Sequence, residues 1–171
     1  GVTTRRVETA REMLAAVEEA LPADVFVAAA AVADWRVANE GGEKIKKQAG
    51  ALPRFDLIEN PDILAAIARR GEGRPPLVVG FAAETEKVID HAKAKLAKKG
   101  CDLIVANDVS PGTGIMGGDR NRVHLVTADG VEDWPDLDKG EVARRIALAI
   151  ASRLAARQQS GGQIGAQGSK P

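Results

Sequence analysis

The chain has 171 residues, with 24 basic and 24 acidic side chains, so its formal net charge is zero. This balance argues against a general nucleic-acid-binding protein, and 3% aromatic residues without tyrosine argue against a surface on which single strands stack. The longest apolar run, residues 25–33, is too short to cross a bilayer, and no secretory signal is visible. The single cysteine, Cys101, excludes an intrachain disulfide and favours a reducing, cytoplasmic setting.

The N-terminal part of the chain predicts strands on either side of a helix. Thr9 and Glu12 form a capping-box pair, and apolar residues then recur at helical spacing up to Pro22. Residues 24–33, DVFVAAAAVA, are apolar on both faces, as in a parallel strand covered by helices. The expected elements are a short strand at 3–8, a helix at 10–21, a central strand at 24–33, a loop to about residue 53 and a strand at 54–59.

The C-terminal part alternates strands and helices more regularly. Asn60 is expected to cap a helix with Pro61 at its first position, Gly100 to end a second helix, and Asp138 to cap the last one. The expected elements are a helix from Asn60 to Gly71, a strand at 76–84, a helix at 86–99, a strand at 101–108, a glycine-rich loop at 107–121, a hairpin of 122–127 and 131–134 around Asp129-Gly130, and a helix at 139–155.

This alternation predicts an α/β fold with three layers, a mostly parallel sheet that carries helices on both faces. Ligands of such folds bind outside the carboxyl ends of the strands. That rule brings together residues 33–47, 59–63, 81–85 and 106–121. One domain is expected over residues 1–156, followed by a disordered tail at 157–171 that is rich in Gly, Ser and Gln.

Lysines gather at two places near this edge. Lys44, Lys46 and Lys47 follow two glycines, which suits a flexible arm that closes over a polyphosphate; the alternative is a solvated surface loop. Lys95 and Lys99 are four residues apart and share one side of a predicted helix. Their alternative role is to complement the negative end of that helix dipole.

Several other residues at this edge have two interpretations. The helix that starts at NPDI offers free N–H groups to an anion, or Asn60 simply caps it. Phe81 packs against a base or belongs to the core, and Glu84 binds a metal, hydrogen-bonds a ligand or does neither. Cys101 and the two histidines are interpreted as structural. The glycine-rich loop matches neither a dinucleotide-binding fingerprint nor a P-loop.

Five segments occur in a fixed order: AAVADWR, EKIKK, NPDI, GFAAET and KLAKKGCDLIVANDVS. Together they resemble the phosphopantothenoylcysteine synthetase (phosphopantothenate–cysteine ligase) family, usually the C-terminal half of a bifunctional coenzyme A biosynthesis flavoprotein in bacteria. The resemblance covers about residues 3–155. It implies a Rossmann-like (ribokinase-like) sheet with a terminal β-hairpin. It also implies that CTP, with Mg²⁺, activates 4'-phosphopantothenate as an acyl-cytidylate, which cysteine's amine then attacks.

The resemblance also implies the site residues. By motif position, the nucleotide contacts are Ala28, Ala29, Ala30, Asp34, Lys44, Pro61, Asp62, Ile63, Leu64, Phe81, Lys95 and Lys99. Among these, Lys44 is the expected catalytic residue, because it would reach the triphosphate and close over the intermediate. Phe81 would pack at the cytosine side. The ligands of the metal are not assigned.

The expected partners are 4'-phosphopantothenate, CTP, cysteine, a second copy of the chain and a fused phosphopantothenoylcysteine decarboxylase domain, which alone would carry FMN. Neither a nucleic acid nor a membrane is expected. The hairpin near 122–134 is a candidate dimer interface. The family's domain begins upstream with a glycine-rich turn and an SSGKMG-like segment, so this chain is expected to lack its first strands. A CTP-binding or dimerisation fragment without independent catalysis is the main alternative, and an unrelated nucleotide-fold oxidoreductase ranks last.

Overall fold

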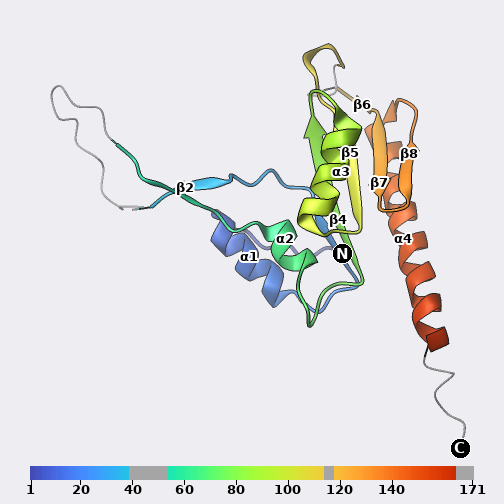
Figure 1. Cartoon of the computed structure of the whole chain (residues 1–171), viewed down its shortest axis with the longest axis horizontal. Helices are drawn as coiled ribbons and strands as arrows, with labels where there is room; N and C mark the ends of the chain where they lie inside the picture. The colour runs from blue at the N-terminus through green and yellow to red at the C-terminus, as the bar shows by residue number, and fades with distance from the viewer. Residues whose placement is uncertain (39–53, 114–117, 165–171) are drawn as a thin grey trace, which may run out of the picture. The chain divides into compact units, whose positions relative to one another are not determined.

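The computed structural model describes residues 1–38, 54–113 and 118–164 (Figure 1). The chain divides into two compact units, which are described separately. The first unit comprises Gly1–Glu19 and Ala30–Ile63, and the second comprises Ala20–Ala29 and Leu64–Pro171. None of the helices in the described part of the chain has the length and apolar character needed to span a membrane.

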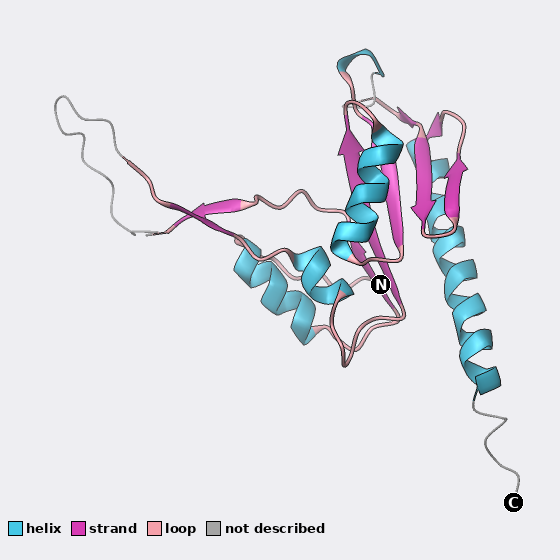
Figure 2. Cartoon of the chain, viewed as in Figure 1, coloured by secondary structure: helices cyan, strands magenta, loops and turns pink. Residues whose placement is uncertain are grey.

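A five-stranded sheet forms the centre of the second unit (Figure 2). Its strands, in spatial order, are β1 (Val25–Ala28), β4 (Leu77–Glu84), β5 (Leu103–Asp108), β7 (Val123–Thr127) and β8 (Gly130–Asp133). The first three strands are parallel to one another. β7 runs antiparallel to β5, and β8 runs antiparallel to β7. The predicted α/β class, with a mostly parallel sheet that ends in a hairpin, is therefore confirmed.

Helices cover both faces of this sheet. The side chains of Leu77, Val79, Leu103 and Val105 form one core with residues of α4 (Lys139–Ile164), among them Val142. On the opposite face lie α3 (Val88–Lys99), which joins β4 to β5, and α2 (Ile63–Ala68). Because side chains alternate along a strand, buried strands need an apolar partner on each face. The three-layer arrangement supplies both partners.

Gly80 allows α2 to approach the sheet closely. A Cβ atom at this position would lie 2.6 Å from a methyl group of Leu64 on α2 and 2.8 Å from a methyl group of Ile104 on β5. Real Cβ contacts of that length essentially never occur, so a larger residue would force the packed side chains of Leu64 and Ile104 to move. The glycine of the GFAAET segment therefore has a packing role inside the second unit.

The first unit contains α1 (Ala10–Glu19) and a two-stranded antiparallel sheet of β2 (Trp35–Val37) and β3 (Leu57–Glu59). The predicted capping box is present at the start of α1. The N–H of Glu12 donates to the Thr9 hydroxyl at 3.1 Å, and the Glu12 carboxylate accepts from the N–H groups of Glu8 and Thr9. These bonds lower the pKa of Glu12 and fix where the helix begins.

Several predicted boundaries differ from the structure. Residues 3–8 form no strand, because no strand of the described residues pairs with them. The central strand ends at Ala28, where its pairing with β4 stops, rather than at residue 33. The predicted glycine-rich loop includes the end of β5, a short 3-10 helix at Pro111–Thr113, and β6 (Arg120–Asn121), which pairs with β9 (Leu137–Asp138).

The last helix and the hairpin follow the prediction with shifted ends. The Asp138 carboxylate accepts from the N–H of Glu141 at 2.8 Å, as expected of a helix cap. However, α4 continues to Ile164 instead of ending at 155. Because Thr127 pairs with Gly130, the turn between β7 and β8 consists of residues 128 and 129.

Candidate functional site

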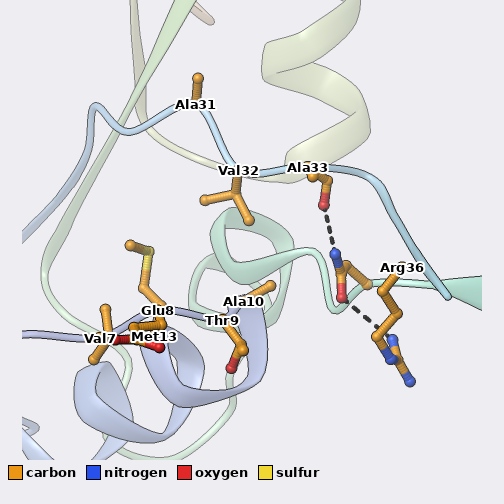
Figure 3. A pocket seen from close by; sticks show the side chains of 10 residues that line it. Val7, Glu8, Thr9, Ala10, Met13, Ala31, Val32, Ala33 and Arg36 are labelled. Atoms are coloured by element: carbon orange, nitrogen blue, oxygen red, sulfur yellow. Dashed lines mark hydrogen bonds between the residues drawn. The ribbon is translucent and has the colours of Figure 1, made fainter. Parts of the chain in front are cut away.

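In the first unit, the side chain of Asn60 joins two of the motif segments. Its amide Nδ2 donates to the carbonyl of Ala33 at 2.9 Å and lies 3.3 Å from the carbonyl of Trp35, while its backbone N–H donates to the carbonyl of Asp34 at 2.8 Å. The Oδ1 atom accepts from Arg36 Nη1 at 3.3 Å. Figure 3 shows two of these bonds as dashed lines, which meet at the side chain between Ala33 and Arg36.

This set of bonds holds the backbone around Asp34. The three consecutive carbonyls of residues 33, 34 and 35 all accept hydrogen bonds from Asn60. Asp34 itself is exposed. The hydrogen bonds therefore hold the backbone on both sides of Asp34, while its carboxylate stands in solvent.

A pocket of about 280 Å³ opens beside this junction within the same unit. Its walls combine apolar side chains with the polar groups of Thr9, Arg36 and Asn60 (Figure 3). The lining residues are Val7, Glu8, Thr9, Ala10, Met13, Ala31, Val32, Ala33, Arg36 and Asn60. Ala30 and Asp34 were predicted as site residues on the same stretch of chain, but neither lines the pocket.

The predicted cap of α2 is wrong. The helix begins at Ile63, and the Asn60 side chain bonds to carbonyls of the preceding segment rather than to helix N–H groups. Tertiary contacts therefore outweigh the local capping preference. Pro61 is half-buried and Asp62 is exposed, just before the first turn of α2.

Two other predicted site residues belong to the core. Ile63 and Leu64 are only 7% and 8% exposed, and Leu64 packs above Gly80. The Leu64 side chain is used in packing α2 against the sheet. Any contact of these two positions with a ligand would therefore have to come mainly from the backbone.

In the second unit, Ala28 ends β1 and is half-buried, whereas Ala29 and the following Ala30 of the first unit are exposed. Phe81 is half-buried and packs against the core cluster around Leu77 and Val79. This contact agrees with the core interpretation of Phe81. It leaves part of the ring accessible, so a contact with a base stays a prediction.

Lys95 and Lys99 lie on α3, as predicted, and both are half-buried. The helix ends in a left-handed Gly100, whose N–H donates to the carbonyl of Leu96 at 2.9 Å. Lys99 is in the last turn, at the negative end of the helix dipole, where a cation is favourable with or without a ligand, whereas Lys95 lies one turn earlier. Lys44, Lys46 and Lys47 lie outside the described residues.

Acidic residues end two neighbouring parallel strands of the second unit. Glu84 and Asp108 are register partners at the carboxyl ends of β4 and β5. Nδ1 of His91 lies 3.1 Å from the Glu84 carboxylate, and the N–H of Ser110 donates to Asp108 at 2.8 Å. Hydrogen bonds from the backbone and side chain of Ser110 lower the pKa of Asp108.

The sequence interpretation did not single out Asp108 as a site residue. The signal that could have found it is its position, since it ends a buried strand at the edge where ligands bind in such sheets. Glu84 and its possible ligand role were noted from the same rule. Across the ranges that the structure describes, no group of three or more His, Cys, Asp or Glu side chains is arranged to hold a metal ion.

Of the three residues interpreted as structural, His124 and Cys101 lie in structural surroundings, whereas His91 is exposed beside Glu84. His124 and Asp133 are cross-strand partners on β7 and β8, with Nδ1 2.5 Å from the carboxylate. Cys101 is 8% exposed, and burial raises the pKa of its thiol. A protonated, buried thiol is a poor nucleophile at neutral pH.

Residues 1–154 match the family described as the DNA/pantothenate metabolism flavoprotein C-terminal domain. The chain belongs to this family. The family match includes both described units, with the segments that carry Asp34, Asn60 and Phe81. The resemblance inferred from the sequence motifs is thereby confirmed.

Relatives of this family agree with the match. The chain is 43% identical over 145 residues to the coenzyme A biosynthesis bifunctional protein CoaBC of Escherichia coli strain K12, an alignment that covers 83% of this chain and 35% of the relative. The crystal structure of the C-terminal domain of CoaBC has a TM-score of 0.70 at 34% identity, and it covers 91% of this chain and 67% of that domain. The chain thus spans about a third of the length of the bifunctional relative.

A more distant structure shares the fold. A Cab2 variant in complex with phosphopantothenate-cysteine has a TM-score of 0.53 at 17% identity, and the match covers 77% of this chain and 44% of Cab2. At this identity the comparison shows a common fold only. The bound phosphopantothenate-cysteine is a property of that protein.

Proposed function

We propose that this chain is the phosphopantothenate–cysteine ligase part of a coenzyme A biosynthesis protein and that it uses CTP. The observation that supports this most strongly is the family match over residues 1–154, together with the relationship to CoaBC. The Cab2 complex supports the nature of the product, because its ligand joins phosphopantothenate to cysteine.

The proposed reaction has two steps. A carboxylate oxygen of 4'-phosphopantothenate attacks the α-phosphorus of CTP, the bond from that phosphorus to the bridging oxygen breaks, and pyrophosphate leaves. The amine of cysteine then attacks the acyl carbon, loses a proton and expels CMP to form the amide. Charge builds on the departing pyrophosphate in the first step, so fixed cations would lower its barrier.

The chain's own residues would take the following roles. Lys44 would neutralise the triphosphate as the catalytic cation, with Lys95 and Lys99 adding positive charge. Asp34 would accept a hydrogen bond from a neutral donor of the nucleotide, because a carboxylate repels the phosphates. The remaining nucleotide contacts proposed are Ala28, Ala29, Ala30, Pro61, Asp62, Ile63, Leu64 and Phe81.

Magnesium fits this proposal as a companion of the nucleotide rather than as an ion held by the protein alone. Mg²⁺ is usually bound by one or two carboxylates together with substrate phosphates and water. The described residues offer single carboxylates but no cluster of three ligands. When bound, the ion would neutralise phosphate charge.

The proposal extends to partners. In the bifunctional relatives, the aligned region is about a third of the protein, so a fused decarboxylase domain that carries FMN is proposed for the parent protein. A homodimer, with the β7–β8 hairpin as a candidate interface, and a cytoplasmic setting complete the proposal. These expectations come from the family resemblance.

Calorimetric titration of CTP with Mg²⁺ tests the nucleotide site. Wild type is compared with the Lys44→Ala, Lys95→Ala double variant, and a Lys46→Ala, Lys98→Ala variant is the control because it loses the same charge. We expect the first variant to lose about a hundredfold in affinity, as for two lost charge-assisted contacts, and the control to lose severalfold at most. Equal losses in both would mean that only net charge matters and would contradict the assigned roles.

A second candidate function is nucleotide binding or dimerisation without catalysis. The supporting observation is that the chain spans about a third of the bifunctional relative and 67% of the CoaBC C-terminal domain. An assay of CMP release from CTP, 4'-phosphopantothenate and cysteine separates the two. Release by a chain that binds CTP supports the ligase, and binding without release supports the second candidate.

A further inference from the structure

Asn60 contacts residues 33–35 through its side chain as well as through the backbone N–H that strand pairing uses. The β2–β3 ladder pairs Trp35 with Glu59, and the next step of this register brings Asp34 opposite Asn60. A residue at the end of a ladder needs to supply only its backbone N–H, which donates to Asp34. The side chain of Asn60 adds two contacts, to the carbonyls on either side of Asp34.

Arg36 determines which way the Asn60 amide faces. Its Nη1 donates to Oδ1 of Asn60 and to the carbonyl of Glu59. If the amide were rotated by half a turn, its NH₂ group would face the guanidinium and its oxygen would face the carbonyls of Ala33 and Trp35. Both arrangements are repulsive, so the guanidinium selects the orientation in which Asn60 donates to these carbonyls.

These bonds constrain the backbone on both sides of Asp34 and leave its side chain in solvent. Rotation about the backbone bonds of residue 34 would move the carbonyl of Ala33 or of Trp35 away from Nδ2. The Cα–Cβ direction of Asp34 is consequently fixed relative to β3. A group held in one geometry loses less conformational entropy when it meets a ligand, which raises affinity.

We propose that Asn60 is a positioning residue that acts through Asp34, and that Arg36 locks its amide in the working orientation. Its role is to hold the Asp34 carboxylate where it contacts the nucleotide. The proposal deepens the proposed function and rests on it, because Asp34 has no nucleotide contact to make unless the chain binds one. The distinguishing consequence is energetic coupling between Asn60 and Asp34.

A double-mutant cycle measures this coupling. Mg²⁺–CTP is titrated into wild type, Asn60→Ala, Asp34→Ala and the double variant, and the thermal unfolding midpoint of each is recorded. We expect Asn60→Ala to weaken binding about tenfold in the wild-type background and less than about twofold in the Asp34→Ala background. Glu59→Gln is the matched control, because it changes the neighbouring side chain and retains the carbonyl that Arg36 contacts.

Every outcome of the cycle decides the proposal. Equal losses in both backgrounds would overturn it, since Asn60 would then act independently of Asp34, as would unchanged affinity in Asn60→Ala. If wild type binds Mg²⁺–CTP and only the coupling is absent, the proposed function stands and this inference fails. A folded wild type that binds no Mg²⁺–CTP overturns both. If Asn60→Ala does not fold, Asn60→Leu replaces it in the cycle, as a neutral side chain of similar size that cannot donate.

Discussion

Among single residues, Gly80 has the clearest effect on packing, through the side chain it lacks. The methyl groups of Leu64 and Ile104 occupy the space that a Cβ would need. We expect Gly80→Ala to lower the free energy of unfolding by about 1–3 kcal/mol, the usual cost of overpacking a tight core. Urea denaturation measures this difference.

Gly71→Ala is the matched control for that prediction. A Cβ at Gly71 meets no atom within 4 Å, so the substitution should change stability by less than about 0.5 kcal/mol. If Gly80→Ala were as mild as Gly71→Ala, the close approach of α2 to the sheet would not be a feature of the folded protein in solution.

Asp108 contributes a pH dependence whose sign follows from its hydrogen bonds. Ser110 lowers the pKa of Asp108 in the folded chain. The unfolded chain therefore binds the proton more tightly, so the stabilisation is present above the ordinary aspartate pKa of about 3.9 and is lost as the pH falls through the lower folded-state value. We expect Asp108→Asn to flatten the fall in unfolding midpoint in acid.

The measurement is the thermal midpoint of wild type and Asp108→Asn between neutral pH and about pH 3, below the ordinary aspartate pKa. Asp129→Asn, at the exposed turn between β7 and β8, controls for the loss of one carboxylate. Parallel curves for wild type and Asp108→Asn would show that the bonds from Ser110 do not favour the ionised carboxylate.

At the level of elements, the amino ends of β4 and β5 are joined by Asp102. One carboxylate oxygen accepts from the N–H of Val78 at 2.7 Å and from Arg74 at 3.0 Å, and the other accepts from Arg157 of α4 at 2.8 Å. The Asp102 side chain is 15% exposed, so these bonds are partly shielded from water. One side chain thus ties two strands to the helix that covers them.

We expect Asp102→Ala to lower the free energy of unfolding by about 2–4 kcal/mol, because it leaves a buried-strand N–H and two guanidinium groups without this acceptor. Arg157→Met should cost less than about 1 kcal/mol, since the Arg157 side chain is 44% exposed and its ion pair is partly screened by water. Chemical denaturation of both variants tests the ranking. A larger loss for Arg157→Met would mean that docking of α4, and not the strand contact, is the main contribution.

Elements that depend on local sequence were predicted well, and elements that depend on distant contacts were not. The two central strands, at 77–84 and 103–108, were predicted almost to the residue because uninterrupted apolar runs between helices have few other solutions. The prediction of a strand at 3–8 was wrong, because the local sequence does not show whether a partner strand is available. The cap predicted at Asn60 failed because a contact 27 residues away competes for the same side chain.

For the candidate site, the sequence predicted the family but not the contacts between individual side chains. Motif order identified the family, and the family match bears it out. What the sequence could not give is the bonding of Asn60 to the carbonyls around Asp34, because that depends on the β2–β3 register. The individual nucleotide contacts, Lys44 among them, stay predictions.

At the level of the whole molecule, the two units differ in how much they bury. β4 and β5 contain side chains with 0–1% exposure, whereas α1 has no buried residue and every residue of β3 is exposed. Amide protection follows burial and hydrogen bonding, so β4 and β5 should exchange slowest, and α1, β2 and β3 much faster.

Hydrogen exchange followed by mass spectrometry measures this contrast within one sample. The ratio of protection between β5 and β3 is the quantity to compare, because both belong to the same chain under the same conditions. Similar protection throughout would contradict separate stabilities for the two units and would mean that the chain opens as a single cooperative body.

The order of the sheet also affects how the chain can assemble. β4 and β5 are joined by a short crossover through α3. In contrast, the connection between β1 and its partner β4 is residues 29–76, which include the segment Ala30–Ile63 of the first unit. Closing a longer loop costs more chain entropy, although the cost rises only with the logarithm of its length. The β4–α3–β5 nucleus should therefore form before β1 docks, and substitutions in β1 should speed unfolding more than they slow folding.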